Sequence, residues 1–161
     1  MYGWLLFAHI ASVAGFLLAH GTSAAMALRL RSEKTRDGIR SLAELSKLTS
    51  GVMYSFILLI FITGLLLGIQ GGWFGRYWIW TAMAVLIATI GVMSALGGRF
   101  NAVRGAVGLP AWDRRGKIST SAPGSPDEIR RAVEAAPVWV ITAIGVAALV
   151  LLLWLMILKP F

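Results

Sequence analysis

The chain has 161 residues, is 58% apolar and has a mean hydropathy of +0.77, which is too apolar for a soluble domain of this size and indicates an integral membrane protein. It contains no cysteine, which excludes disulfides, thiolate metal sites, iron–sulfur clusters and covalently attached c-type haem. The net charge of +8 does not indicate a nucleic-acid partner, because the basic residues gather in two loops.

Four apolar stretches are each close to the length of about 20 residues that an α-helix needs to cross a bilayer. They run over about 3–28, 52–69, 77–96 and 138–158. The runs are continuous rather than alternating, which argues against strands, since an open sheet edge has no hydrogen-bond partners in lipid. The sequence therefore predicts an all-α, four-transmembrane-helix bundle that forms one domain over residues 1–161, with the lipid bilayer as its first partner.

The charged loops predict how the chain is oriented. Of the 15 Lys and Arg residues, all but Arg76 and Lys159 lie in the loops 29–51 and 97–137. Because cytoplasmic loops carry the excess of basic residues, both loops are expected in the cytoplasm and both termini outside. Trp139 then falls near the inner boundary of the membrane. Five other tryptophans fall near the outer boundary, namely Trp4, Trp73, Trp78, Trp80 and Trp154.

A secretory signal is a rival interpretation of the first stretch, with Ala25-Met26-Ala27 as the cleavage site. It is disfavoured because the basic residues follow the apolar run instead of preceding it. The first stretch is therefore expected to remain as a membrane span.

Both loops contain helix signals. Residues 32–47 are expected to form a short surface helix with the apolar stripe Ile39, Leu42, Leu45 and Leu48. This stripe would lie either on the membrane surface or against the ends of the bundle. Residues 105–126 have loop composition. They end in Ser125-Pro126-Asp127-Glu128, a capping-box start for a helix that buries Ile129 and Val133, exposes Arg130, Arg131 and Glu134, and stops at Pro137.

Stripes of small residues predict the faces on which the spans pack, because close van der Waals approach drives helix association in lipid. The first span carries Ala8, Ser12, Gly15, Ala19 and Ser23, the second Gly64 and Gly68, and the third Ala84, Ala88, Gly91 and Ala95. A compact bundle follows. The same stripes are compatible with a homodimer or with a larger membrane complex.

His9 and His20 are the only histidines, and both lie in the first span. An ionisable group at membrane depth is a candidate functional residue. The spacing of 11 residues places both on nearly one face, about 16 Å apart along the helix axis. Neutral imidazole binds haem iron, copper or zinc, so both histidines are candidate cofactor and metal ligands.

Met83 in the outer part of the third span and Met53 in the inner part of the second are candidate second ligands, because a His/Met pair can hold haem iron or copper. In a homodimer each histidine would instead meet its symmetry mate. A structural role is the other interpretation. The histidines would then donate to hydroxyls or carbonyls of neighbouring helices, with Ser55, Thr63, Thr81, Thr89, Ser94 and Thr142 available.

No Asp or Glu lies inside a span, and all seven acids are in the basic loops. A proton-coupled transporter normally needs a carboxylate within the membrane, and Ser-His-Asp catalysis needs an acid beside the histidine. Neither activity is supported, no catalytic residue is predicted, and whether the chain is an enzyme is left open.

The opening Trp4-Leu-Leu-Phe-Ala-His9-Ile resembles that of the DUF2269 family of bacterial four-helix membrane proteins, which is related to the copper-resistance D (CopD-like) proteins. Similar landmarks are Thr63-Gly64-Leu-Leu-Leu-Gly68, Gly71-Gly72-Trp73 and Met156-Ile-Leu-Lys159-Pro160. The resemblance implies a four-helix fold in the bacterial inner membrane. It identifies His9 as the family-like histidine, whereas His20 departs from the family pattern.

The favoured interpretation is a membrane protein that binds haem b or copper through His9 and His20, with a role in electron transfer or metal handling. The CopD-like relatives imply copper or haem only by analogy. The alternative is a non-catalytic membrane subunit that packs in a larger complex without a cofactor of its own. A small-solute transporter is the least favoured function.

Overall fold

The computed structural model describes residues 1–112 and 116–161 and is about 81% helical. In chain order its elements are α1 (Tyr2–Ser32), α2 (Arg36–Gln70), the 3-10 turn η1 (Trp73–Gly75), α3 (Tyr77–Gly97), α4 (Phe100–Ala106), β1 (Ala111–Trp112), β2 (Ile118–Ser119), α5 (Pro126–Ala135) and α6 (Val138–Leu158). Asp113, Arg114 and Arg115, which belong to the second basic loop, lie outside the described residues.

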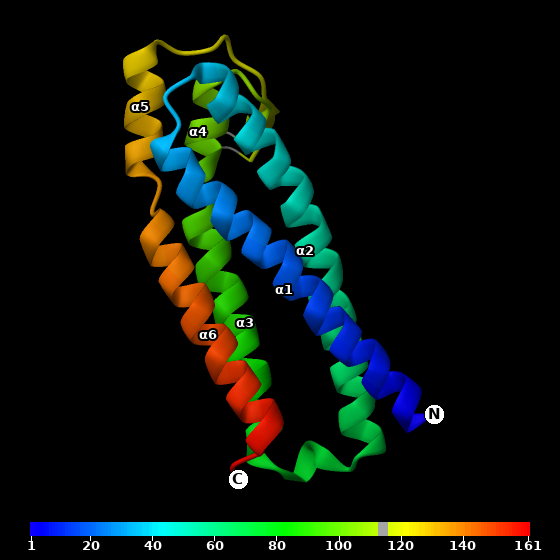
Figure 1. Ribbon diagram of the computed structural model, residues 1–161. Helices are drawn as coiled ribbons and strands as arrows, with labels where there is room; N and C mark the ends of the chain where they lie inside the picture. The colour runs from blue at the N-terminus through cyan, green and yellow to red at the C-terminus, as the bar shows by residue number, and fades with distance from the viewer. Residues whose placement is uncertain (113–115) are drawn as a thin grey trace.

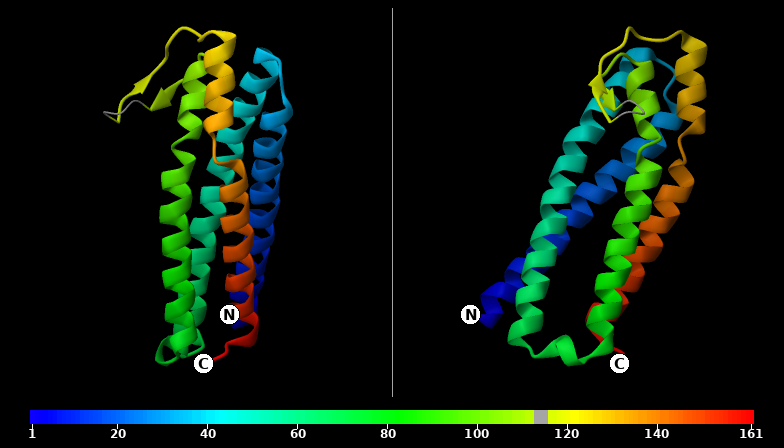
Figure 2. Two further views of the ribbon diagram at one scale, coloured as in Figure 1. Left: turned by 90° about the vertical axis from the view of Figure 1, so that its left-hand side faces the viewer. Right: turned by 180° about the vertical axis from the view of Figure 1, so that it is seen from behind.

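Four helical segments of the described chain are long and apolar enough to cross a membrane, as the sequence predicts. They form two antiparallel pairs, α1 with α2 and α3 with α6. Both termini lie at one end, which we call the terminal end, and α4, α5 and the small β1–β2 hairpin lie at the other, which we call the loop end (Figures 1 and 2). The fold is therefore that of a multi-pass membrane protein.

The first loop is much shorter than expected. Residues 32–47 do not form a separate surface helix, because α2 already begins at Arg36 and continues through the second span to Gln70. Only residues 33–35 separate it from α1. Thr35 caps α2 by accepting a hydrogen bond from the backbone N–H of Gly38 at 3.2 Å.

The apolar stripe of residues 39–48 divides into two halves. Ile39 is buried and Leu42 packs beside it at the loop end, whereas Leu45 and Leu48 are 51% and 68% exposed. The first half therefore packs on the bundle, which is one of the two placements that the sequence leaves open.

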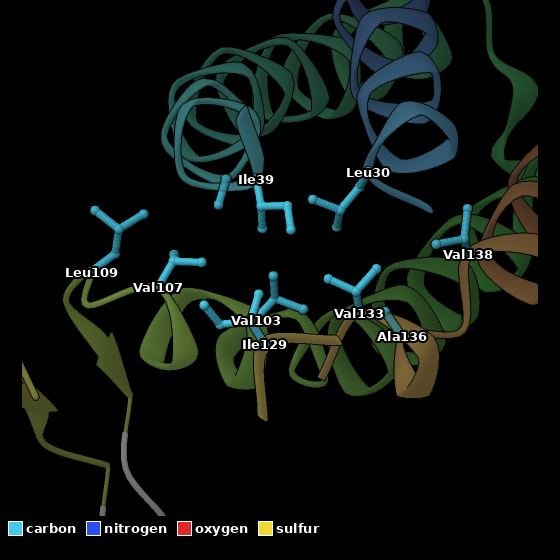
Figure 3. Packing of buried hydrophobic residues seen from close by; sticks show 10 residues of the cluster. Leu30, Ile39, Val103, Val107, Leu109, Ile129, Val133, Ala136 and Val138 are labelled. Atoms are coloured by element: carbon cyan, nitrogen blue, oxygen red, sulfur yellow. The ribbon is translucent and has the colours of Figure 1, made fainter. Parts of the chain in front are cut away.

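A small hydrophobic core closes the loop end. Leu30 of α1 and Ile39 of α2 face Val103, Ile129 and Val133 of α4 and α5 across it (Figure 3). The other members are Ala43, Val107, Leu109, Ala136 and Val138. Because segments distant in the sequence supply this core, it fixes the positions of the helices that enter the membrane.

Helix α5 forms as its sequence predicts. The Ser125 N–H donates to the Glu128 carboxylate at 2.7 Å, and the Glu128 N–H donates to the Ser125 hydroxyl at 3.4 Å, which completes a capping box. Ile129 and Val133 are buried. Arg130, Arg131 and Glu134 are exposed, and Pro137 stands between α5 and α6.

Two of the three predicted small-residue faces are contact faces. In α1, Ser12 and Ala19 are buried, and Gly15 lies directly beneath the ring of Phe56 on α2. In α2, Gly68 is buried and Gly64 adjoins His9. Close approach at Gly15 and Gly64 explains the tight pairing of α1 with α2, whereas Gly68 packs against Phe74 of η1 and Ile79 of α3.

The third predicted face is wrong for the single chain. Ala84, Ala88, Gly91 and Ala95 of α3 are all exposed. The side of α3 that is buried instead carries Trp78, Ile79 and Ala82. Small side chains mark a surface that permits close approach, but here no helix of the described chain covers it.

Aromatic residues link the chain ends to the first turn of α3 at the terminal end. The Lys159 ammonium lies 4.0 Å from the ring centroid of Trp73 and 5.5 Å from that of Trp78. The ring of Tyr2 meets that of Trp73 edge-on, with 6.3 Å between the ring centroids. The backbone N–H of Trp78 donates to the backbone carbonyl of Phe161 at 3.3 Å. These cation–π and ring contacts hold the terminal end together.

Candidate functional site

His9 lies on α1 and forms a hydrogen bond with Thr63 on α2, with 2.8 Å between Nδ1 and Oγ1. The Thr63 hydroxyl lies 2.6 Å from the carbonyl oxygen of Leu59, to which it donates its proton. Because that proton is already committed, the Thr63 oxygen accepts from His9, and Nδ1 carries the imidazole proton. The lone pair of the ring is therefore on Nε2.

Gly64 lets the His9 ring approach α2 closely. A β-carbon at this position would lie 3.2 Å from Cε1 and 3.7 Å from Nδ1 of His9. The ring is half-buried and is held between the Thr63 hydroxyl and the Gly64 backbone. A neutral imidazole oriented through one nitrogen, with the other free, has the arrangement usual for metal-ligating histidines.

His20 lies deeper along α1, toward the loop end, in a different setting. Its half-buried ring stacks on Phe16 with centroids 5.4 Å apart and planes 13° apart. Neither ring nitrogen has a hydrogen-bond partner in residues 1–112 or 116–161. A polar group without a partner in an apolar setting is costly, so His20 is the less satisfied of the two histidines.

Gly145 of α6 and Met93 of α3 surround the edge of His20. A β-carbon on Gly145 would lie 2.7 Å from His20 Nε2 and 3.5 Å from Met93 Cε. Both side chains therefore reach the same point on α6. His20 connects the α1–α2 pair to the α3–α6 pair at this glycine.

The two methionines proposed as second ligands lie on two different helices. Met53 is half-buried on α2 and Met83 is half-buried on α3. The methionine that the structure places beside a histidine is Met93 of α3, which the sequence analysis did not select as a ligand. Whether Met93 lies beside His20 depends on how α3 is rotated about its axis against α6, and the sequence does not give that rotation.

Within the described part of the chain, no three or more His, Cys, Asp or Glu side chains gather where they could hold a metal ion. The imidazoles of His9 and His20 are thus the strongest candidate metal ligands inside the spans. The described residues offer single histidines as candidate ligands, with His9 the oriented one.

Comparison of the chain with protein-family models, curated proteins and solved structures finds no match.

Proposed function

We propose that this chain is a multi-pass protein of the bacterial inner membrane that binds haem b or copper through the imidazole of His9 and has a role in electron transfer or metal handling. The observation that carries the proposal is the His9–Thr63 hydrogen bond, which leaves Nε2 as the free, basic nitrogen of a ring fixed at membrane depth. The resemblance to the DUF2269 family and its CopD-like relatives points the same way.

His20 is proposed as the second ligand position. Its ring has no hydrogen-bond partner among the described residues, and the thioether of Met93 reaches the same glycine. A bound haem or copper would supply one-electron redox chemistry. The protein would contribute ligand orientation and an apolar setting, both of which tune such a centre.

The test is the haem and copper content of the protein purified in detergent. The proposal expects a Soret absorption band or stoichiometric copper in the wild type. His9→Ala should reduce the retained cofactor by about tenfold or more, given that even the loss of a residue supporting a ligand costs 10–100-fold. Thr89→Val is the matched control, because its hydroxyl bonds only to the Val85 carbonyl of its own helix. A colourless, copper-free protein after expression with haem and copper supplied would refute this function.

A second candidate is a non-catalytic subunit that packs in a larger membrane complex or pairs with a second copy. The observation that favours it is the exposed small-residue face of α3, formed by Ala84, Ala88, Gly91 and Ala95. Such faces pack against other helices in lipid. Ala88→Phe would disrupt that packing, whereas Val146→Phe, at a position of α6 that is 56% exposed, would not. A detergent-solubilised assembly that loses mass with the first substitution only supports this function.

The proposed orientation places the loop end in the cytoplasm and the terminal end outside, as the basic loops indicate. Since the natural chain has no cysteine, single cysteines report on it without background. Gly75→Cys in η1 and Ser119→Cys in β2 both introduce an exposed thiol. Labelling of intact cells with an impermeant maleimide should modify Cys at position 75 but reach position 119 only after lysis, and the reverse pattern would invert the topology.

A further inference from the structure

A partly open cavity of about 380 Å³ lies at the loop end, where the apolar parts of the spans finish. Its walls come from α1, α2, α3, α4 and the β1–β2 hairpin. Met26 and Met93 line its side toward the spans, and Trp112 and Ile118 of the hairpin line its rim. Met26 and Met93 lie near the loop-end limits of the predicted apolar stretches 3–28 and 77–96, so the cavity is expected near the level at which hydrocarbon gives way to lipid headgroups.

Among the described residues, the charged side chains that line this cavity are both positive. Lys47 of α2 and Arg104 of α4 line it, and no Asp or Glu does so among the residues that the structure describes. Lys47 has no hydrogen-bond or ion-pair partner in residues 1–112 or 116–161. Lys47 is exposed, whereas Arg104 is half-buried. A partly buried cation is expensive without a counter-charge, so the half-buried guanidinium of Arg104 favours an anion, and the ammonium of Lys47 adds to the positive charge of the lining.

The guanidinium of Arg104 is held in position by two carbonyl groups. Its Nη1 donates to the Ala43 carbonyl at 2.7 Å, and its Nε donates to the Pro110 carbonyl at 3.2 Å. Both acceptors are neutral, so they orient the group and leave its charge in place. Planar, fixed guanidinium groups are well suited to phosphate oxygens.

Neutral polar groups complete the lining. The side chains of Asn101 and Tyr54 line the cavity and make no hydrogen bond within the described residues. They can therefore serve ester and hydroxyl oxygens of a ligand. The volume lies in the usual range for small-molecule sites and exceeds what a single phosphate ion fills, while the methionines offer an apolar path along the spans.

We propose that this cavity binds the headgroup of an anionic phospholipid, with the phosphate at Lys47 and Arg104 and the glycerol and acyl chains along Met26 and Met93. Charge complementarity and the position at the hydrocarbon boundary both select a lipid over a soluble anion. The proposal does not rest on haem or copper binding, because neither His9 nor His20 lines the cavity. Met93 is the one residue that both lines the cavity and adjoins His20 at Gly145 among the described residues.

The test uses the full chain, delipidated in an uncharged detergent at about 0.15 M salt, where charges more than about 8 Å apart are largely screened. The protein is titrated with dioctanoyl-phosphatidylglycerol, with dioctanoyl-phosphatidylcholine and with inorganic phosphate. Binding is read from the melting temperature and from bound lipid counted by native mass spectrometry. We expect saturable binding of phosphatidylglycerol at a stoichiometry near one, and weaker binding of the other two ligands.

Lys47→Gln removes one cavity charge without breaking a contact, so its fold should be intact. It should weaken phosphatidylglycerol binding about fivefold, the effect of one basic residue near an anionic headgroup. Lys34→Gln is the matched control, since Lys34 is exposed in the same basic segment and does not line the cavity. It should change the affinity less than twofold at this salt concentration.

Three results would overturn the proposal. Equal weakening by both substitutions would mean diffuse attraction rather than a site. Equal binding of phosphatidylcholine would remove the role of the charges. Inorganic phosphate that binds as tightly as phosphatidylglycerol would identify a site for the free anion instead.

Discussion

The Nδ1 atom of His9 donates a hydrogen bond to the Thr63 hydroxyl across 2.8 Å, and this bond joins α1 to α2 in the apolar part of both helices. The same hydroxyl donates to the Leu59 carbonyl, so the three groups form a chain with a defined direction. This chain fixes the ring and determines which nitrogen holds the lone pair. The bond therefore serves both packing and any ligand role of His9.

Thr63→Val should destabilise the protein by about 0.6–2 kcal/mol, because it keeps the side-chain volume but leaves the His9 N–H without an acceptor. If His9 is a ligand, the same substitution should also weaken cofactor retention about tenfold by freeing the ring. The free energy of unfolding is measured by titration with denaturing detergent in mixed micelles.

Thr89→Val is the control for that measurement, since the half-buried Thr89 hydroxyl donates only to the Val85 carbonyl one turn earlier. Its effect should be markedly smaller. Equal losses in the two variants would show that the His9–Thr63 bond contributes nothing of its own.

Local signals in the sequence predicted the loop end well where a few adjacent residues decide the structure. The capping box of Ser125 and Glu128 needs only one turn of backbone, and the spacing of Ile129 and Val133 marks one helix face. The continuity of α2 was missed because its composition changes near Val52. The backbone continues as a helix there, since neither proline nor a competing cap interrupts it.

Contacts between helices were predicted less well, because they depend on rotation and axial register. Thr63 was one of several hydroxyls that could meet a histidine, and only the packing of α1 on α2 selects it. The small residues of α3 marked a face without naming its partner. Likewise, Lys47 and Arg104 are 57 positions apart in the numbering, and their shared cavity follows only from the folded loop end.

Ile129→Ala should destabilise the protein by about 2–5 kcal/mol, because it opens a void in the core that joins α1, α2, α4 and α5. Leu48→Ala removes a similar side chain that is 68% exposed and should cost about 0.5 kcal/mol or less. Thermal unfolding in detergent distinguishes the two. Similar melting temperatures would mean that the loop end does not stabilise the whole molecule.

Acid should weaken the start of α5 through Glu128. Hydrogen bonds from the Ser125 backbone and side chain hold the pKa of this carboxyl below its ordinary value of 4.5. The folded state therefore favours the ionised form. This contribution is complete above pH 4.5 and is lost as the pH falls through the lower pKa of the folded state.

Glu128→Gln keeps an acceptor for the Ser125 N–H but removes the charge and its titration. The melting temperature of the wild type should exceed that of this variant at neutral pH, and the difference should shrink at pH values below 4.5. Glu134→Gln, at an exposed position of α5 outside the capping box, should show no such convergence. A difference that persists unchanged in acid would contradict the role assigned to Glu128.

Gly145→Ala tests the contact that links the two helix pairs inside the membrane. The added methyl group would lie 2.7 Å from Nε2 of His20, so the ring or the helix must shift to make room for it. Overpacking of this kind costs about 1–3 kcal/mol, against a gain of up to about 1 kcal/mol in helix propensity.

Gly21→Ala gives the propensity gain alone, because no atom lies within 4 Å of the new methyl group. Gly145→Ala should therefore be less stable than Gly21→Ala in detergent unfolding. In a His20→Ala background the penalty at Gly145 should disappear, because the clashing ring is gone and the double-mutant cycle isolates that pair. A penalty that survives the removal of His20 would place the cause in α6 itself and would separate His20 from the α3–α6 pair.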